Sequence, residues 1–392
     1  MASSLSFLLE MSVILAAAIF GGFISKKLGQ PAVLGQIIAG IALGLLSIEK
    51  SEFVSHISEI GVIFLMFIAG LETDVKELVD SGKSSSMIAF GGVLVPGILV
   101  FLGMYAFTGG DIGIALFMAV VSTATSVSIS VQTLREMNQL RTRQGISILG
   151  AAIIDDIVGI ILLTFVVAAV RPTEGVSIGH TLLNISLFFL IAVLAGYALT
   201  KFSKFCEGRF NLDHKIVTYS IIVCFVLAFL SEELGVAAIT GSYFAGVMFS
   251  MTSHRHKVSH EVNKIASIFF TPVFFVAIGM GVNLKEAVSA IGIGSLFIVL
   301  AVIGKLAGCG LGARMSGFSF KHAIQIGVGM IPRAEVAIII ATLGVKLGVI
   351  GDREMAAVIL MVVATTLATP SLLKLAFNDK PPKNSKKTVS QA

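Results

Sequence analysis

The stretch IIDDIVG, residues 153–159, places two adjacent carboxylates, Asp155 and Asp156, inside an apolar run. They are the only ionisable side chains between residues 145 and 170. At about 1.5 Å per helical residue, they lie roughly 18 Å from the arginine before the run and about 23 Å from the arginine after it. A helix over this run is long enough to cross a bilayer, so both acids are predicted near the midplane.

The composition is typical of a polytopic membrane protein. Of 392 residues, 56% are hydrophobic and 13% are charged, whereas a soluble domain is about 25% charged. Apolar runs of about twenty residues recur along the chain and leave no room for a soluble domain. The positive residues behind the net charge of +5 lie mainly in the loops between these runs, so we predict no nucleic-acid partner. We predict no cofactor, and Cys206, Cys224 and Cys309 lack metal-site or disulfide spacing.

Thirteen transmembrane helices are predicted, which makes residues 1–377 an all-α membrane domain in contact with the lipid bilayer. A short, polar, lysine-rich tail, 378–392, follows this domain. The predicted spans are 4–25, 31–47, 57–71, 84–107, 111–134, 145–170, 179–203, 215–232, 236–251, 262–281, 287–311, 321–346 and 352–377.

The basic residues of the loops predict how the domain is oriented. Most lysines and arginines fall in the odd-numbered loops and in the tail, whereas the even-numbered loops carry only Lys50, Arg171, Lys285, Lys346 and Arg353. Cytoplasmic loops of membrane proteins are enriched in lysine and arginine. The N-terminus is therefore predicted outside the cell and the C-terminus in the cytoplasm.

Two of the predicted spans contain a break. The first carries VVSTATSVSIS, residues 120–130, with small hydroxyl residues in a row; the second carries GVGMIPRAEVAIII, residues 327–340, with Pro332 and two charges. Proline removes an amide donor, and serine and threonine can bond freed carbonyls. The broken spans are seven apart and cross in opposite directions, which is typical of inverted repeats. Spans 1–6 and 8–13 are then the repeats, and span 7 links them.

The charges that remain inside spans are Asp155, Asp156, Lys305, Arg333 and Glu335. Each costs about 2.5–3.5 kcal/mol at a helix centre and needs a partner or a water-filled cavity. The two acids point about 100° apart on a helix, so they cannot share one proton. Either one acid faces a cavity while the other faces a neighbouring helix, or both acids only hold helices together.

The other residues of the two breaks and Lys305 have two interpretations each. Lys305 pairs with one of the aspartates or snorkels toward Arg314. Arg333 and Glu335, at the break around Pro332, either neutralise helix-end dipoles or only hold the crossing together without touching substrate. A cation could bind the hydroxyls and carbonyls of the first break, or these residues serve only small-residue packing. The candidate cation ligands there are Ser122, Thr123, Thr125 and Ser126.

Three histidines, His254, His256 and His260, cluster in a loop predicted to be cytoplasmic. Histidine titrates near neutrality, so this loop is a candidate pH sensor. A metal site and a plain solvated loop are the alternatives.

Six stretches together resemble one family, the monovalent cation:proton antiporters of the second family, and most closely its NapA-like sodium/proton antiporters. They are ILGAAIIDDIVGIILL (148–163), VVSTATSVSIS, IGKLAG around Lys305, GMIPRAEVAIII (329–340), KKLGQPAVLGQIIAGIALG (26–44) and EIGVIFLMFIAGLETD (59–74). The resemblance covers nearly the whole membrane domain.

The resemblance implies a homodimer in the plasma membrane of a prokaryote, with elevator-type alternating access. It implies scaffold helices at about 1–83 and 215–285, a transport core at about 84–170 and 286–377, and a linker helix at about 179–205. Asp156 matches the ion-binding acid, which would hold Na+ as its metal, and Asp155 the acid before it. Lys305 matches the lysine that pairs with an acid of this site when the site is open to exchange. Arg333 and Glu335 match the charges of the second broken helix. The paired acids resemble electrogenic members.

The predicted activity is exchange of Na+, or Li+, for H+, and the protein is not expected to be an enzyme. A carboxylate in a cavity binds a proton or a cation but not both well, so one acid can couple the two fluxes. Exchange or efflux of K+ remains an alternative, although with a short tail after the last span the chain is not expected to carry the nucleotide-binding domain of the potassium-efflux relatives. A gated cation channel and a sodium-coupled organic-anion transporter are further alternatives. An intramembrane aspartyl protease needs acids on facing helices, and here both lie on one.

Overall fold

The computed structural model describes residues 6–46, 48, 50–170, 178–206, 215–281 and 290–377, and this part of the chain is helical without strands. The predicted tail 378–392 and the loop residues Arg171 and Lys285 lie outside the described residues. The side chains of Glu335 and Cys206 also lie outside what the structure describes.

Every predicted span coincides with a helix or with a pair of helices. The first half contains α1 (Ser6–Lys27), α2 (Ala32–Leu45), α3 (Glu52–Glu72), α4 (Val75–Asp80), α5 (Gly82–Phe107), α6 (Ile112–Thr123), α7 (Val127–Glu136), α8 (Arg143–Val170) and α9 (Ile178–Cys206). The second half contains α10 (Ile216–Glu233), α11 (Ala238–Ser250), α12 (Arg255–Ile265), the π-helix η3 (Ala266–Phe270), α13 (Thr271–Met280), α15 (Ile291–Met315), α16 (Phe320–Gly329), α17 (Glu335–Lys346) and α18 (Asp352–Ala376). The short, surface-lying α4 was not predicted, and neither was most of α12, because residues 255–261 were expected to be a loop.

The helices of this chain are those of an integral membrane protein. Within the described residues, ten helices or helix pairs are long and apolar enough to cross a bilayer unaided. The three other predicted spans correspond to the shorter α2 and α11 and to the broken pair α16 and α17. The three therefore depend more on packing against neighbouring helices than on their own length.

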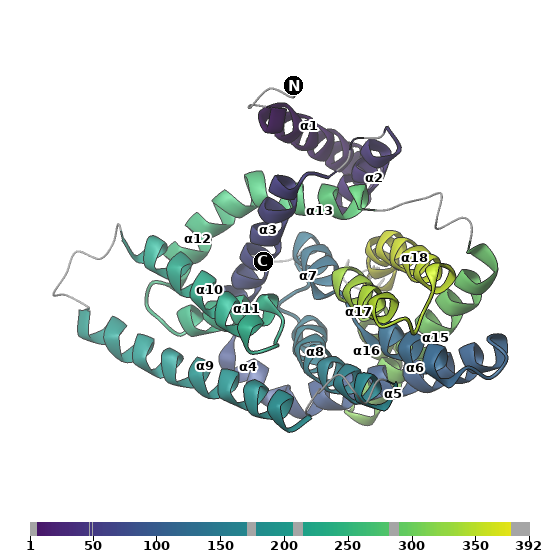
Figure 1. Cartoon of the computed structure of the whole chain (residues 1–392). Coiled ribbons are helices and arrows are strands. Elements are labelled where there is room, and N and C mark those ends of the chain that lie inside the picture. The colour runs from purple at the N-terminus through teal and green to yellow at the C-terminus, as the bar shows by residue number, and fades with distance from the viewer. Residues whose placement is uncertain are drawn as a thin grey trace, which may run out of the picture.

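Helix packing sorts most of the chain into two groups. The α5 group consists of α5, α6, α8, α15, α16, α17 and α18, and the α3 group consists of α1, α2, α3, α10, α11, α12 and α13. Figure 1 shows α15 to α18 with α5 and α6 on the right and α10 to α12 on the left, with α9 below these. Between the groups lies α7, which contacts α2 and α3 on one side and α8 and α18 on the other.

Glycines allow the closest helix contacts within each group. A Cβ added to Gly308 of α15 would lie 2.0 Å from the carbonyl oxygen of Gly91 of α5, and one added to Gly246 of α11 would lie 2.1 Å from that of Phe67 of α3. No side chain fits at such distances. Close backbone contact therefore replaces the hydrophobic effect, which does not drive association between helices in lipid.

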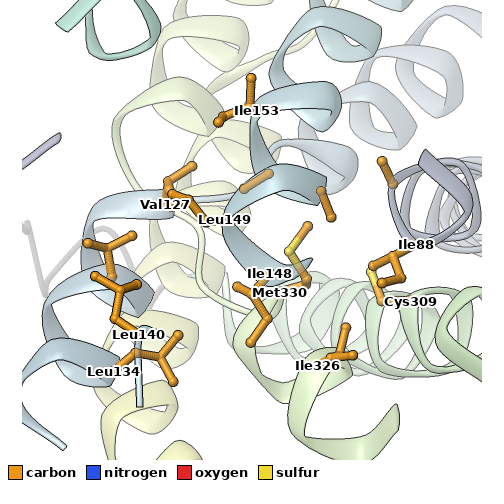
Figure 2. Close-up of a cluster of buried hydrophobic side chains, with 14 of the residues drawn as sticks. Ile88, Val127, Leu134, Leu140, Ile148, Leu149, Ile153, Cys309, Ile326 and Met330 are labelled. Carbon is orange, nitrogen blue, oxygen red and sulfur yellow. The ribbon is translucent and has the colours of Figure 1, made fainter. Parts of the chain in front are cut away.

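The predicted cytoplasmic half of α8 is fixed by an apolar cluster. Figure 2 shows Ile148 and Leu149 of α8 in this cluster, with Met330 from the second break beside Ile148. Cys309 of α15 and Ile88 of α5 close it on another side. The cluster holds the helix that carries both aspartates against the two broken helices.

Candidate functional site

The two broken helices meet at their breaks. Helix α6 ends at Thr123 and α7 begins at Val127, whereas α16 ends at Gly329 and α17 begins at Glu335. The backbone N–H of Ser126 donates a hydrogen bond of 2.7 Å to the carbonyl of Pro332. The Ser130 hydroxyl donates one of 2.5 Å to the carbonyl of Gly329. These bonds join the two crossed helices and satisfy backbone groups that the breaks set free.

Arg333 is fully buried at this crossing and bonds carbonyls of both breaks. Its Nε and Nη2 donate to the carbonyl of Ser122 at 3.0 and 2.8 Å. Its Nη1 donates to the carbonyls of Met330, at 3.1 Å, and Ile331. One guanidinium thus places positive charge at the C-terminal ends of α6 and α16, where the helix dipoles are negative.

Two threonines of α18 hold the backbone of Arg333. The Thr365 hydroxyl accepts from its N–H at 3.2 Å, and the Thr366 hydroxyl donates to its carbonyl at 2.8 Å. Nothing in the sequence singled out these residues, because hydroxyls in an apolar helix usually bond their own preceding turn.

Lys305 is fully buried and points into the α5 group instead of snorkelling toward the membrane surface. Its Nζ donates to the carbonyl of Thr123 at 2.7 Å and forms an ion pair of 2.8 Å with Oδ1 of Asp155. Asp155 is only 2% exposed. Lys305 therefore joins α15, the end of α6 and the acidic helix α8 at one point.

Asp156 lies beside this ion pair and is 8% exposed. Among the residues that the structure describes, no hydrogen bond or ion pair reaches its carboxylate. Within the same residues, Oδ2 of Asp155 and Oγ1 of Thr125 are buried without a hydrogen-bond partner. A buried polar oxygen without a partner is costly unless a ligand or water supplies one. Oxygen donors of this kind suit a hard monovalent cation, and the unpaired carboxylate of Asp156 has a charge that can balance one.

The four predicted hydroxyl ligands are not equivalent. The hydroxyls of Ser122 and Thr123 donate to the preceding turn of α6, at 2.6 and 2.8 Å. Ser126 shares a hydrogen bond of 3.2 Å with Ser128. Thr125 alone of the four has a buried hydroxyl without a partner among the described residues, and it is the strongest candidate of the four.

Gly159 lies one helical turn from Asp156, and sequence reasoning did not single it out. It is buried, yet a Cβ built on it would meet no atom within 4 Å. Its direction on the helix lies between those of the two aspartates, since residues are 100° apart. Open space therefore lies beside Gly159, on the side of α8 between the directions of the two acids. The only signal for it in the sequence is a glycine in the stretch IIDDIVG.

The loop predicted around the three histidines is wrong: α12 begins at Arg255 and packs against α3, η3 and α10. His254 precedes α12, His256 is exposed on it, and Nε2 of His260 is 3.9 Å from Oε1 of the half-buried Glu261. Within the described ranges, no three histidine, cysteine or acidic side chains come together as metal ligands. The pH-sensing interpretation stays a prediction.

Comparison with known proteins gives one consistent result. Residues 14–378 match the family described as sodium/hydrogen exchanger, transmembrane. The chain is 40% identical over 95% of its length to the Na+/H+-K+ antiporter GerN of Bacillus cereus, covering 97% of that protein. It is 32% identical over 93% of its length to a Na+/H+ antiporter of Enterococcus hirae, covering 96% of it.

A solved structure shares the fold. The sodium proton antiporter MjNhaP1 of Methanocaldococcus jannaschii superimposes with a TM-score of 0.70, over 95% of this chain and 98% of that one, at 15% sequence identity. The predicted all-helical antiporter fold is thus confirmed.

Proposed function

Because the chain belongs to the sodium/hydrogen exchanger family, we propose that it exchanges Na+, or Li+, for H+ across the membrane with Asp156 as the shared binding site. The observation that carries this proposal is the contrast between two neighbouring acids. Asp155 is occupied by Lys305, whereas the buried carboxylate of Asp156 has no partner among the described residues. A carboxylate in that position needs a proton or a cation.

Competition at Asp156 couples the two fluxes. Protonation removes the charge that attracts the cation, and a bound cation favours loss of the proton. The carboxylate therefore crosses the membrane carrying one or the other. The free oxygens of Thr125 and Asp155 complete the cation site, and the space beside Gly159 gives access to it.

In this proposal Lys305 determines how much net charge one exchange cycle moves across the membrane. When the cation arrives, Asp155 is drawn toward it, and Lys305 releases a proton as its ion pair breaks. Two protons then exchange for one Na+, and the net charge moved makes exchange electrogenic. The membrane potential would contribute about 2.3 kcal/mol per charge per 100 mV.

The packing groups support an elevator-type motion. In this proposal the α3 group is the scaffold and the dimer interface, and the α5 group with α7 is the transport core. The N-terminus lies outside and the C-terminus in the cytoplasm of a prokaryotic cell, as the basic loops predict. Arg333 holds the crossed helices together while the core moves as one body.

Exchange of K+ is the second candidate, because a relative at 40% identity over nearly the whole chain is named for K+ as well as Na+. The site offers only oxygens, and oxygen donors bind either ion. A channel is the remaining alternative, in which Asp156 would act as a selectivity residue without a counter-flux of protons.

Proton flux in proteoliposomes tests these proposals. Purified protein is reconstituted with an internal pH dye, and pulses of Na+, Li+ or K+ are added with and without an imposed potential. We expect a cation-dependent pH change that Asp156→Asn abolishes and that the exposed control Asp80→Asn retains. Robust exchange by Asp156→Asn would remove Asp156 from its role, and cation leak without proton movement would establish a channel.

A further inference from the structure

A cavity of about 540 Å³ lies between α7 and the α3 group, on the side predicted to be cytoplasmic. It is separate from the acids of the exchange site, and charged and amide side chains from both sides line it. Those from α7 are Gln132, Arg135 and Glu136, and those from the α3 group are Glu72 and Asn263; the hydroxyl residue Ser267 of η3 also lines the cavity.

Arg135, in the last turn of α7, bonds two helices of the α3 group. Its Nε lies 3.3 Å from Oε1 of Glu72 on α3, and its Nη2 donates to Oδ1 of Asn263 on α12 at 2.5 Å. The side chains of Arg135 and Glu72 are 19% and 17% exposed. An ion pair this shielded is stronger than one on an open surface, because water screens it less.

Glu136, the last residue of α7, bonds a third helix of the α3 group. Its Oε2 accepts from the backbone N–H of Ala32, the first residue of α2, at 2.6 Å. Its Oε1 accepts from Nε2 of Gln132 at 3.1 Å, which fixes the carboxylate. A negative charge at the N-terminus of α2 is also favoured by the helix dipole.

Glu72 is held firmly in its own group. Arg255 of α12 donates from Nε to the carbonyl of Leu71 at 2.8 Å and from Nη2 to that of Glu72 at 3.0 Å. The end of α3 is therefore fixed to α12. Arg135 meets a rigid partner, so the contact resists movement of α7 and not only of side chains.

Helix α7 connects these contacts to the exchange site. It has ten residues and is about 15 Å long. Its first turn follows Ser126, which bonds Pro332 at the crossing, and its last turn carries Arg135 and Glu136. Hydrogen bonds of 2.5–3.3 Å do not survive a displacement of several ångströms of one group past the other. These contacts therefore exist in only one of the states that an elevator visits.

We propose that Arg135 and Glu136 of α7, with Glu72, Asn263 and the N–H of Ala32, form an interdomain clamp that stabilises the state seen in this structure. Arg135 is then a positioning residue for exchange: it acts through α7 and touches neither the cation nor the proton. The inference rests on the proposed elevator exchange, and adds to it the contacts that set the balance between its two end states.

The clamp has a measurable consequence on the two sides of the membrane. A ligand's apparent affinity falls in proportion to the fraction of protein in the state that is open to it. Loss of the clamp depopulates the present state, so apparent Na+ affinity falls on the side to which this state opens and rises on the other. We expect opposite changes of about five- to tenfold, at the lower end of the usual range for such coupling.

The test uses the full-length protein in right-side-out and everted membrane vesicles from cells lacking their own antiporters. The half-saturating Na+ concentration for proton flux is measured from each side for wild type, Arg135→Gln and Glu72→Gln. The pair Arg135→Glu with Glu72→Arg restores the ion pair with reversed charges, and it should return both values toward wild type. Arg141→Gln is the matched control, because Arg141 lines the same cavity but forms no ion pair within the described residues.

Opposite shifts in Arg135→Gln, absent from Arg141→Gln and reversed by the charge swap, support the clamp. Shifts of the same sign on both sides, or equal shifts in Arg141→Gln, overturn it, because they report a general change of surface charge or damage to the fold. If wild-type vesicles show no Na+-driven proton movement, the proposed function fails. The clamp is then tested by amide hydrogen exchange at Ala32. Exchange should be faster in the double variant Arg135→Gln, Glu136→Gln than in wild type, and unchanged in Arg141→Gln. Unchanged protection of Ala32 in the double variant overturns the clamp.

Discussion

Lys305 and Arg333 are both fully buried cations at the end of α6, yet their surroundings differ. Lys305 bonds one carbonyl, of Thr123, and one carboxylate, of Asp155. The guanidinium of Arg333 bonds only carbonyls among the described residues, those of Ser122, Met330 and Ile331. The partner of Lys305 is therefore one that a cation or a proton can compete for, whereas the partners of Arg333 cannot change charge.

This difference separates a fixed part of the site from a changeable one. An arginine remains charged under all physiological conditions and presents a rigid fork of donors, whereas a lysine is a single ammonium on a flexible stem. The guanidinium suits permanent neutralisation of two helix ends. The lysine suits an ion pair that breaks during each transport cycle.

The largest effect is expected at Arg333. Arg333→Ala leaves carbonyls of both breaks without donors inside the membrane, so the free energy of unfolding should fall by about 3–5 kcal/mol. Thermal unfolding of the purified protein measures this loss. Arg333→Lys keeps the charge but reaches fewer carbonyls and should be intermediate, and wild-type stability in Arg333→Ala would show that the crossing does not depend on it.

Lys305→Ala should have a smaller effect on stability and a specific effect on charge movement. It leaves the carboxylate of Asp155 buried without a partner, which costs about 3 kcal/mol. Adding Asp155→Asn removes the orphaned charge and should recover much of the loss, since contacting residues are strongly non-additive. Exchange by Lys305→Ala should be weak or electroneutral. An unchanged response of its initial rate to membrane potential would contradict the two-proton scheme.

The third prediction concerns Thr125, which is part of the changeable site but holds no helix. Thr125→Val removes a hydroxyl that has no partner among the described residues, so stability should not fall. The half-saturating Na+ concentration should rise about three- to tenfold, the value of roughly one hydrogen bond. Thr133→Val is the control, because that hydroxyl donates to the carbonyl of Ile129 in its own helix. Equal affinities in the two variants would exclude Thr125 as a ligand.

The sequence was sufficient to predict the spans and the crossing. Apolar length, basic loops and the breaks around residues 124 and 332 each have a direct physical cause in the membrane. Residue types alone left Lys305 to pair with either aspartate, because adjacent residues differ only in direction around a helix whose rotation the sequence does not give. Its pairing with Asp155 was a hypothesis that followed from choosing Asp156 as the exchanging acid, and the structure has Lys305 Nζ 2.8 Å from Oδ1 of Asp155. The contact of Arg135 with Glu72 was also hidden, since 63 residues separate two ordinary loop charges.

The smallest effect is expected at Gly159, and Gly308 provides its contrast. A Cβ at Gly308 would lie 2.0 Å from the carbonyl oxygen of Gly91, whereas one at Gly159 would meet no atom within 4 Å. Gly308→Ala must push α5 and α15 apart, so it should destabilise the protein. Gly159→Ala should preserve stability or raise it by up to about 1 kcal/mol, because alanine favours a helix over glycine.

Transport distinguishes whether the space beside Gly159 serves the changeable site. A methyl group there narrows the path to Asp156 without touching Lys305 or Arg333. The rate of exchange should therefore fall in the series Gly159→Ala, Gly159→Val and Gly159→Leu while the response to membrane potential stays that of wild type. Rates that do not depend on side-chain size would mean that ions reach Asp156 from another direction. A lost voltage response in this series would instead link the space to the ion pair of Lys305. Ion access and charge movement would then depend on the same part of the site.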